Sequence, residues 1–213
     1  MKDVEKSIKI TVLLTTIICL LPIIIGAIYY NELPEQMAIH FNNAGEADNY
    51  MNKNFVIFGL PTLLAVLNLY NQFRLVTDPK KTNYSKVLLG LSQWLIPVIS
   101  VGAMSYTILV GLGKGFNISN VGAIITGILI IILGNYLPKC RFNYTMGIKL
   151  PWTLNSEENW NKTHRLAGFI WVVGGLIILL SALWKAEYVV LAVIGTIVLI
   201  PLVYSFLLYR RGI

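Results

Sequence analysis

The chain has 213 residues, of which 56% are hydrophobic and only 13% are charged, and its formal net charge at pH 7 is +7. An average soluble domain has roughly 25% charged residues, so this composition excludes an ordinary soluble globular protein. The basic excess does not indicate direct nucleic-acid binding, because no part of the sequence could form a basic soluble domain.

Six apolar runs are long enough to cross a bilayer. A hydrocarbon core about 30 Å thick is spanned by about 20 helical residues, and the runs do not alternate as the strands of a membrane barrel would. We therefore predict an all-α, polytopic membrane protein with six transmembrane helices. In chain order the runs are Ile10–Tyr30, Phe55–Tyr70, Val87–Leu112, Val121–Leu137, Leu166–Trp184 and Tyr188–Leu208.

The basic residues predict how these helices are oriented, because cytosolic loops carry an excess of Lys and Arg. With both termini in the cytosol, 14 of the 17 basic residues lie inside and only Lys53, Lys114 and Lys185 lie outside. The opposite orientation would invert this split, so we predict an N-in, C-in topology. The residues then placed inside are Lys2, Lys6, Lys9, Arg74, Lys80, Lys81, Lys86, Lys139, Arg141, Lys149, Lys162, Arg165, Arg210 and Arg211.

The predicted spans are poor in polar chemistry. They hold no ionisable residue away from their ends, and such residues commonly mark ion paths or proton relays, so an ion-coupled transporter is disfavoured. Small residues recur at close-packing spacing in the fourth and fifth helices, which predicts closely packed helices. They are Ser119, Ala123 and Gly127 in the fourth and Gly168, Gly174 and Gly175 in the fifth. The prolines that interrupt spans, each of which frees a backbone carbonyl and predicts a kink, are Pro22, Pro61, Pro97 and Pro201.

The longest predicted outside loop, residues 31–54, has a sequence with local structure. Residues 37–41 have the pattern of a short strand or of an interfacial stretch, and residues 42–45 are turn-forming, with Gly45 suited to a positive φ. Three interpretations stay open for this loop: a structural cap, a surface that contacts a peptide or other ligand, and a metal site built from His40, Glu46 and Asp48. The spacing of these three residues matches no known metal-binding pattern.

The predicted cytosolic loop, residues 138–165, carries the densest mixture of polar and aromatic residues. Asn155, three residues before Glu158, predicts a helix cap, and a helix from Ser156 could continue into the fifth span. Three interpretations stay open: an interfacial anchor with Trp152 and Trp160 at headgroup depth, a docking surface for a cytosolic protein or lipid headgroups, and catalysis by Glu157 and His164, which share a helix face. No nucleophile or set of metal ligands accompanies this pair.

The two loops carry a resemblance to a known family. The outer loop resembles the N-terminal membrane domain of unknown function of Sdp-type immunity proteins, and the stretch from Gly134 to Gly168 is similar to the C-terminal region of these SdpI-like proteins. Lys149 and Leu150 stand where the family usually has Arg and Thr. The matching residues are Leu33, Pro34, His40, Phe41, Asn42, Gly45, Asp48 and Tyr50 in the first motif, and Gly134, Asn135, Tyr136, Pro138, Lys139, Asn143, Gly147, Ile148, Pro151, Trp152, Thr153, Leu154, Trp160, Thr163, His164, Arg165 and Gly168 in the second.

The resemblance implies a function that composition does not. The best-known member of this family protects a Gram-positive producer from its own secreted, bacteriocin-like toxic peptide. The best-known member is also a receptor that, with toxin bound, holds a cytosolic ArsR-type repressor at the membrane. We therefore expect a multi-pass immunity protein of the bacterial cell membrane, active in toxin resistance and signal transduction. A small-solute transporter or channel, and a membrane-interface enzyme, are the alternatives.

The resemblance also implies two domains and two sets of contact residues. The domains are an N-terminal membrane domain, residues 1–73, and a C-terminal four-helix region, residues 74–213. No enzyme activity, cofactor or metal is expected. The predicted topology places His40 and His164 on opposite sides of the membrane, which excludes a metal centre built from both histidines of one chain. Expected toxin contacts are Leu33, Pro34, His40, Phe41, Asn42, Gly45, Asp48 and Tyr50. Expected partner-docking residues are Asn135, Pro138, Asn143, Gly147, Lys149, Pro151, Trp152, Thr153, Glu157, Trp160, Thr163, His164 and Arg165.

Overall fold

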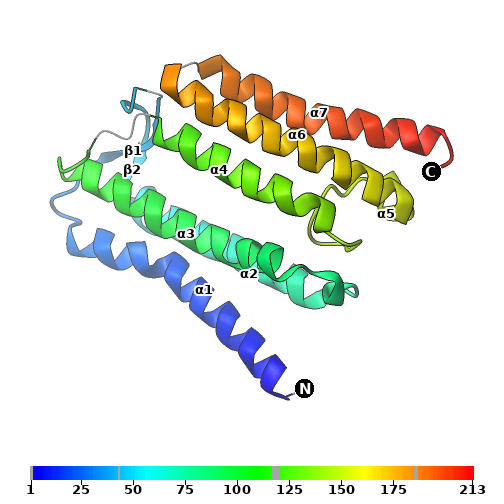
Figure 1. The fold of residues 1–213 in the computed structure, drawn as a ribbon. Helices are drawn as coiled ribbons and strands as arrows, with labels where there is room; N and C mark the ends of the chain where they lie inside the picture. Colours follow the sequence, from blue (N-terminus) through cyan, green and yellow to red (C-terminus); the bar gives the residue numbers. More distant parts are fainter. Residues whose placement is uncertain (1, 43, 117–119, 185–186) are drawn as a thin grey trace. The chain divides into compact units, whose positions relative to one another are not determined.

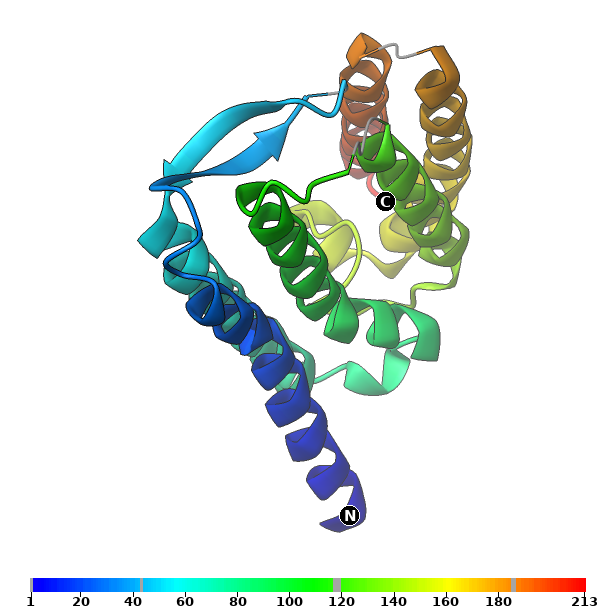
Figure 2. The ribbon, with the colours of Figure 1, turned by 90° about the vertical axis from the view of Figure 1, so that its left-hand side faces the viewer.

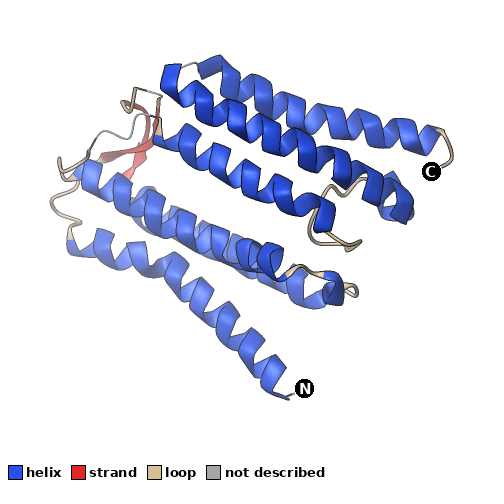
Figure 3. Cartoon of the chain, viewed as in Figure 1, coloured by secondary structure: helices blue, strands red, loops and turns tan. Residues whose placement is uncertain are grey.

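Helices make up most of the chain, as Figure 3 shows. The structure, a computed structural model, describes residues 2–42, 44–116, 120–184 and 187–213. In this described part six helices are long and apolar enough to cross a membrane, which confirms the predicted six-span, all-α fold. They are α1 (Lys2–Ile28), α2 (Leu60–Thr77, continuing a π-helical turn, η1, at Phe55–Gly59), α3 (Lys86–Gly111), α4 (Val121–Tyr136), α6 (Glu157–Trp184) and α7 (Glu187–Arg210).

The remaining elements are short. Two strands, β1 (Gln36–Phe41) and β2 (Ala47–Asn52), pair as an antiparallel hairpin between α1 and α2. Of the two interpretations left open for residues 37–41, the structure has the strand, and the second strand was not predicted. The other short elements are the 3₁₀ turns η2 (Lys81–Asn83) and η3 (Leu137–Lys139) and the single-turn helix α5 (Pro151–Asn155).

Two compact units make up the chain (Figure 1). The first contains residues 1–77 and 90–118, which hold α1, the hairpin, α2 and most of α3. The second contains residues 78–89 and 119–213, which hold α4, α5, α6 and α7. The expected domains, 1–73 and 74–213, stay a prediction, as does the N-in, C-in orientation. Lys185, one of the three basic residues predicted outside, and Ser119, one of the small residues predicted to pack closely, are not among the described residues.

The hairpin of the first unit is fixed to the helices by a small apolar core. Leu33, which precedes β1, and Met37 of β1 are almost fully buried against Val56, Ile57 and Ile108. In Figure 2 the two strands continue from the last turn of α1 and lead into η1 and α2. The core therefore holds the hairpin at the end of this unit where α1 ends and α2 begins.

Polar side chains within the first unit connect its helices. Asn68 and Gln72 of α2 are buried, and their amide groups donate to the Thr15 hydroxyl of α1 at 3.0 and 3.2 Å. Gln72 also donates to the Gln93 carbonyl of α3 at 3.3 Å. That carbonyl has no helical donor because Pro97, four residues later, lacks an N–H. These polar residues join helices to one another, as expected for helix contacts inside a membrane.

Glycines let α4 and α6 of the second unit approach to backbone contact. A Cβ added at Gly175 would lie 2.7 Å from the Gly127 carbonyl oxygen, and one added at Gly134 would lie 3.0 Å from the Gly168 carbonyl oxygen. Any larger residue would push the two helices apart. The predicted close packing through these glycines is therefore confirmed.

A hydrogen bond to a carbonyl that a proline leaves free joins α7 to α6. Pro201 lies inside α7 and removes the helical donor to the carbonyl of Ile197. The indole Nε1–H of Trp171 on α6 donates to this carbonyl at 3.0 Å. Ile197 also belongs to the apolar core between the two helices, with Ile178 and Val193.

Candidate functional site

The expected contact residues lie in two places, one in each unit. The first is residues 31–54 of the first unit, which we name the hairpin segment. The second is residues 138–165 of the second unit, which we name the α4–α6 loop. In each place the described side chains form a defined hydrogen-bond network rather than an irregular connection.

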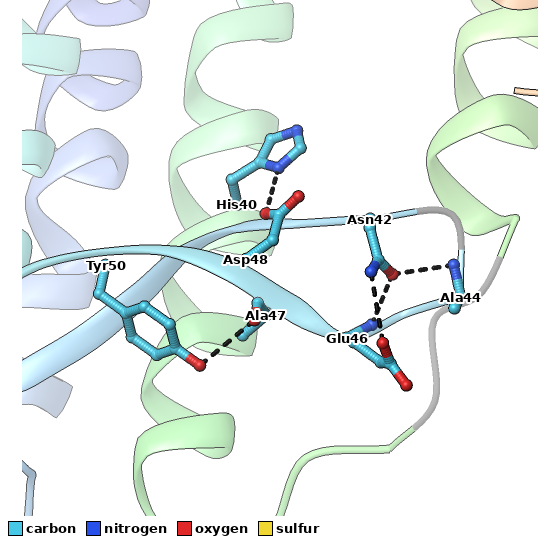
Figure 4. Close-up of polar contacts among 7 residues, drawn as sticks. All are labelled: His40, Asn42, Ala44, Glu46, Ala47, Asp48 and Tyr50. Atoms are coloured by element: carbon cyan, nitrogen blue, oxygen red, sulfur yellow. Dashed lines mark hydrogen bonds and ion pairs between the residues drawn. The ribbon is translucent and has the colours of Figure 1, made fainter. Parts of the chain in front are cut away.

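Asn42 organises the turn of the hairpin. Its side-chain oxygen accepts the backbone N–H groups of Ala44 at 2.9 Å and Glu46 at 3.0 Å (Figure 4). The backbone N–H of Gly45 donates to the Asn42 carbonyl at 2.9 Å, and Gly45 has a φ of +81°. The left-handed conformation of Gly45, predicted from the sequence, lets the chain reverse within four residues.

Two irregularities in the strand pairing bring His40 and Asp48 together. The register changes between Ala38 and His40, and again between His40 and Phe41. Such bulges rotate side chains out of regular alternation. The Nδ1–H of His40 donates to the Asp48 carboxylate at 2.6 Å, and the two side chains are 66% and 43% exposed (Figure 4). An exposed pair of this kind adds little to stability, so both side chains are available to a ligand.

A second ion pair anchors the base of the hairpin. The Lys53 ammonium lies 2.9 Å from the Glu35 carboxylate and 4.5 Å from the centre of the Tyr30 ring. The Glu35 hydrogen bond and charge raise the pKa of Lys53 above its usual value. The Tyr30 hydroxyl in turn donates to the Asn54 side chain. The end of α1 and the start of η1 are thereby tied together under the strands.

Beside the turn lies a hollow of about 410 Å³. Phe41 of β1 packs edge-on against Tyr106 of α3, with ring centres 5.0 Å apart, and Tyr106 packs in the same way against Phe116. Glu46 and Val110 also line the hollow. This part of the first unit therefore presents aromatic surface next to acidic and backbone polar groups.

The α4–α6 loop is held in shape by Asp78, a buried carboxylate at the start of the second unit. Asp78 accepts from the Lys80 N–H at 2.7 Å, the Tyr84 hydroxyl at 2.8 Å, the Thr145 hydroxyl at 2.7 Å and the Tyr144 N–H at 3.0 Å. Burial alone would raise the pKa of this carboxyl, but the four hydrogen bonds outweigh burial and lower the pKa. Asp78 is therefore a charged group that fixes the loop to residues 78–84.

Cys140 and Asn143 form the turn that follows α4. The Asn143 side-chain oxygen accepts the N–H groups of Thr145 at 3.0 Å and Met146 at 2.6 Å, and its amide donates to the Arg141 carbonyl at 2.9 Å. The Cys140 thiol is buried, and burial raises its pKa. The thiol is thus an uncharged packing group of the turn.

Trp160 and His164 of α6 form the core of the loop. Their rings stack with centres 4.0 Å apart, and the Trp160 Nε1–H donates to the Cys140 carbonyl at 2.7 Å. His164 has backbone partners on both ring nitrogens, because Nδ1–H donates to the Trp160 carbonyl at 2.7 Å and Nε2 accepts the Ile148 N–H at 2.9 Å. This pattern requires a neutral ring with its proton on Nδ1. Gly147 covers the pair, with a φ of +106°.

Two further contacts tie the loop to α7. The Trp152 Nε1–H of α5 donates to the Ser205 hydroxyl at 2.9 Å. The buried Asn159 amide of α6 donates to the Ser205 carbonyl at 2.9 Å, and its oxygen accepts the Thr163 hydroxyl at 3.0 Å. Thr153 closes α5 onto itself, because its hydroxyl accepts the Leu150 N–H at 2.9 Å and donates to the Ile148 carbonyl at 2.8 Å.

Known protein families match this chain in both the hairpin segment and the α4–α6 loop. Residues 139–205 match the SdpI/YfhL protein family, and residues 17–65 match a domain of unknown function (DUF1648). The chain is 31% identical over 193 residues to "Immunity protein SdpI" of Bacillus subtilis (strain 168), which covers 91% of this chain and 91% of that protein. The chain belongs to this SdpI family. No solved structure matches it. Six apolar helices and this membership make the chain a multi-pass bacterial membrane protein.

The structure separates the SdpI-like residues of the hairpin segment by location. Leu33 is in the core, whereas Asn42 and Gly45 shape the turn. Those with exposed side chains are Pro34, His40, Asp48 and Tyr50, and Phe41 is half-buried beside the hollow. Within the described ranges no three His, Cys, Asp or Glu residues lie close enough to hold a metal ion.

The residues expected to dock a partner also divide into two sets. The buried ones, which hold the loop in shape, are Asn143, Thr153, Trp160, Thr163 and His164. The exposed ones, which alone could contact a partner directly, are Asn135, Pro138, Gly147, Lys149, Pro151, Glu157 and Arg165, with Trp152 half-buried. Lys149 already donates to the Thr145 carbonyl at 2.6 Å.

Trp160 is fully buried within the protein, because its ring fits between His164 and Phe142, and its depth in the membrane stays a prediction. Two other details of the α4–α6 loop differ from the predictions. The cap of α6 is Ser156, whose hydroxyl accepts the Asn159 N–H at 3.1 Å, rather than Asn155, which closes α5. Glu157 is exposed and does not pair with His164, whose ring nitrogens bind backbone groups instead. The predicted pair of Glu158 and Lys162 is present at 2.7 Å.

Sequence reasoning missed three residues that organise the loop, of which Asp78 and Ser205 lie outside it and Asn159 lies within it. None was among the expected site residues, although Asp78 binds Thr145, Asn159 binds Thr163 and Ser205 binds Trp152. For Asp78 one signal was available, since a carboxylate two residues before a Lys-Lys pair at a helix end is well placed to accept backbone N–H groups. Ser205 carried no such signal.

Proposed function

We propose that this chain is a bacterial immunity protein that protects the cell in whose membrane it lies against a secreted toxic peptide. The hairpin segment would face outside and meet the peptide, and the α4–α6 loop would face the cytosol. The observation that carries the proposal is the 31% identity to an immunity protein over 91% of both chains. Identity of that extent includes both units, so it is not a similarity of one membrane segment alone.

The test of this function is survival of a sensitive strain. Cells that express the full chain are challenged with culture supernatant of the strain that carries this gene. We expect survival at supernatant doses that kill cells with the empty vector. Killing at the same dose, with the protein present in the membrane, would refute the proposal.

The orientation has a separate test. The split of basic residues supports N-in, C-in, and the exposed positions Asn52 and Arg211 lie on opposite sides in that topology. Both native cysteines are first replaced by serine, and a cysteine is placed at one of the two positions. A membrane-impermeant thiol reagent added to whole cells should label Asn52→Cys and not Arg211→Cys. The reverse labelling would overturn the orientation.

We also propose that the α4–α6 loop docks a cytosolic repressor of the ArsR type. This rests on the family resemblance and on the shape of the loop, which Asp78 and the stacked Trp160–His164 pair hold without any partner present. Arg165 and Lys149 are exposed on it. If a small repressor gene lies beside this one, its product should co-purify with the full chain, and less so with Arg165→Ala. If the repressor is recovered equally from membranes that contain the wild-type chain and from membranes that lack it, docking is refuted.

The alternatives predict different readouts. A transporter or channel predicts flux of a small solute into proteoliposomes that contain the purified chain. A membrane-interface enzyme would need His164 to exchange a proton, but both ring nitrogens are engaged by backbone groups. Protection by a His164→Gln variant that stays folded would therefore separate immunity from any catalysis at this residue.

A further inference from the structure

Strand β2 has one free edge. It pairs with β1 on one side only, in a sheet of two strands, and five of its six residues are exposed. In the described chain no other strand covers the second edge. A free edge presents backbone N–H and C=O groups that can pair with another extended chain.

The register identifies which groups point outward. The Lys53 N–H donates to the Glu35 carbonyl at 2.9 Å, and the regular pairs that follow join Gln36 to Asn52, Met37 to Met51 and Ala38 to Tyr50. In an antiparallel ladder, pairs with mutual hydrogen bonds alternate with pairs that have none. The N–H and C=O groups of Tyr50 and Asn52 therefore point away from β1.

This edge is held in place before any ligand arrives. Met37 and Ala38 of the partner strand are buried, with exposures of 0% and 4%, and Asn42 fixes the turn. A ligand strand would consequently have to order only itself, which favours binding. The bulges at Ile39 on β1 and Asp48 on β2 end the regular ladder, so the available length is that of residues 49–52.

The charge of the surroundings selects the kind of ligand. The hairpin segment carries Glu32, Glu35, Glu46 and Asp48 against Lys53, a formal net charge of −3. Lys53 is already paired with Glu35, and His40 with Asp48. A cationic segment is attracted to such a surface, and an anionic one is repelled.

We propose that the outer edge of β2 binds an extended, cationic peptide segment by strand addition, with backbone hydrogen bonds to Tyr50 and Asn52. The inference rests on the proposed function, because it assigns the toxic peptide to this edge. Strand addition takes its affinity from the backbone and its specificity from alternate side chains. The exposed Tyr50 ring and the His40–Asp48 pair would meet those side chains.

The test uses two substitutions of Tyr50 in the full chain, expressed in the sensitive strain and challenged with the supernatant described above. Tyr50→Pro removes the outward N–H without removing a ladder hydrogen bond, and proline is tolerated at such edge positions. Tyr50→Ala removes the ring and keeps the N–H. We expect cells with Tyr50→Pro to survive only supernatant doses about tenfold lower than those survived by cells with Tyr50→Ala. The comparison requires equal amounts of both proteins in the membrane.

The outcomes separate the two proposals. If wild type fails to protect, the immunity function itself is refuted and this inference falls with it. Should Tyr50→Pro protect as well as Tyr50→Ala, strand addition at this edge is wrong while the function stands.

A second measurement does not depend on the proline variant folding. The photoreactive residue p-benzoylphenylalanine is placed at position 50, or at position 58 on the neighbouring η1 turn as control, and cells are irradiated in supernatant. An adduct of peptide mass at 50 and not at 58 supports the proposal. No adduct at position 50, or one with the mass of a second copy of this chain, overturns it.

Discussion

Asp78 offers the sharpest test of how the second unit is built. The substitution Asp78→Asn keeps the size of the side chain and replaces one carboxylate oxygen by an amide that can only donate. With the remaining oxygen facing Tyr84, Tyr144 and Thr145, the new amide faces the Lys80 N–H, now 2.7 Å from a donor instead of an acceptor. The variant therefore loses one charge-assisted bond and weakens three others.

The expected cost follows from these four contacts. A hydrogen bond to a charged group contributes about 1.5–3 kcal/mol, so one lost bond and three weakened ones should destabilise the loop by about 3 kcal/mol. That corresponds to about a 100-fold rise in the population of the open loop. Hydrogen–deuterium exchange of residues 140–148 in lipid nanodiscs should reveal it as faster exchange of the Tyr144 and Met146 amides.

A matched control separates this effect from loss of a negative charge. Glu158→Gln removes an exposed carboxylate that pairs with Lys162 on the same unit, and it should change exchange by no more than about 0.5 kcal/mol. Unchanged exchange of residues 140–148 in Asp78→Asn would refute the assignment of Asp78 as the group that holds the loop.

The same residue predicts a pH dependence with a definite sign. The pKa of Asp78 is lowered in the folded protein, so its contribution to stability is complete above the unfolded-state pKa of about 3.9 and is lost as the pH falls through the lower, folded-state pKa. The difference in thermal midpoint between wild type and Asp78→Asn should accordingly be constant near neutral pH and shrink under acid conditions. A difference that grows as the pH falls would contradict this reasoning.

Three further predictions concern other contacts. Gly147→Ala places a Cβ 2.5 Å from the His164 Nε2 at a φ of +106°, and should destabilise the protein by more than about 2 kcal/mol. The control Gly212→Ala, at a φ of +83° with open space around it, should cost about 1 kcal/mol. Equal shifts in thermal midpoint for the two variants would show that the His164 contact is unimportant. Trp171→Phe should cost about 1–3 kcal/mol by leaving the Ile197 carbonyl without a donor, and much less in a Pro201→Ala background that restores the helical donor, so additive costs in this double-mutant cycle would refute the coupling. His40→Ala and Asp48→Asn should each change stability by less than about 1 kcal/mol yet reduce protection in the survival assay; full protection by both would remove this pair from the proposed contact surface.

The spans could be predicted from the sequence because they depend on length and apolar composition alone. The glycine contacts of α4 and α6 were also predictable, since small residues within apolar helices have few other uses. The turn at Asn42–Gly45 depends on local backbone chemistry and was equally accessible. Strand β2 was not, because its residues, ADNYMN, have weak strand preference and form a strand only through pairing with β1.

The interior of the α4–α6 loop was hidden from the sequence for a different reason. Asp78 and Tyr144 are 66 residues apart and meet only in the folded unit. The burial of Trp160 was not predicted, because it depends on the absence of a side chain on Gly147, which leaves room for the stacked Trp160–His164 pair. Which of the expected docking residues are buried therefore depended on contacts that no local pattern encodes.

Pro201 has a consequence for how α7 can move. Within a helix nearly every carbonyl already accepts a hydrogen bond from the helix itself, so a neighbouring helix finds few backbone groups to bind. By removing one N–H, Pro201 leaves the Ile197 carbonyl without a helical donor, and Trp171 uses it, while Asn159 binds the Ser205 carbonyl further along α7. A slide of α7 by one residue along α6, or a rotation about its own axis, would break that bond with no equivalent carbonyl to replace it. By exposing the Ile197 carbonyl, the proline thus favours one register of α7 against α6, which the aliphatic side chains between the two helices would not determine by themselves.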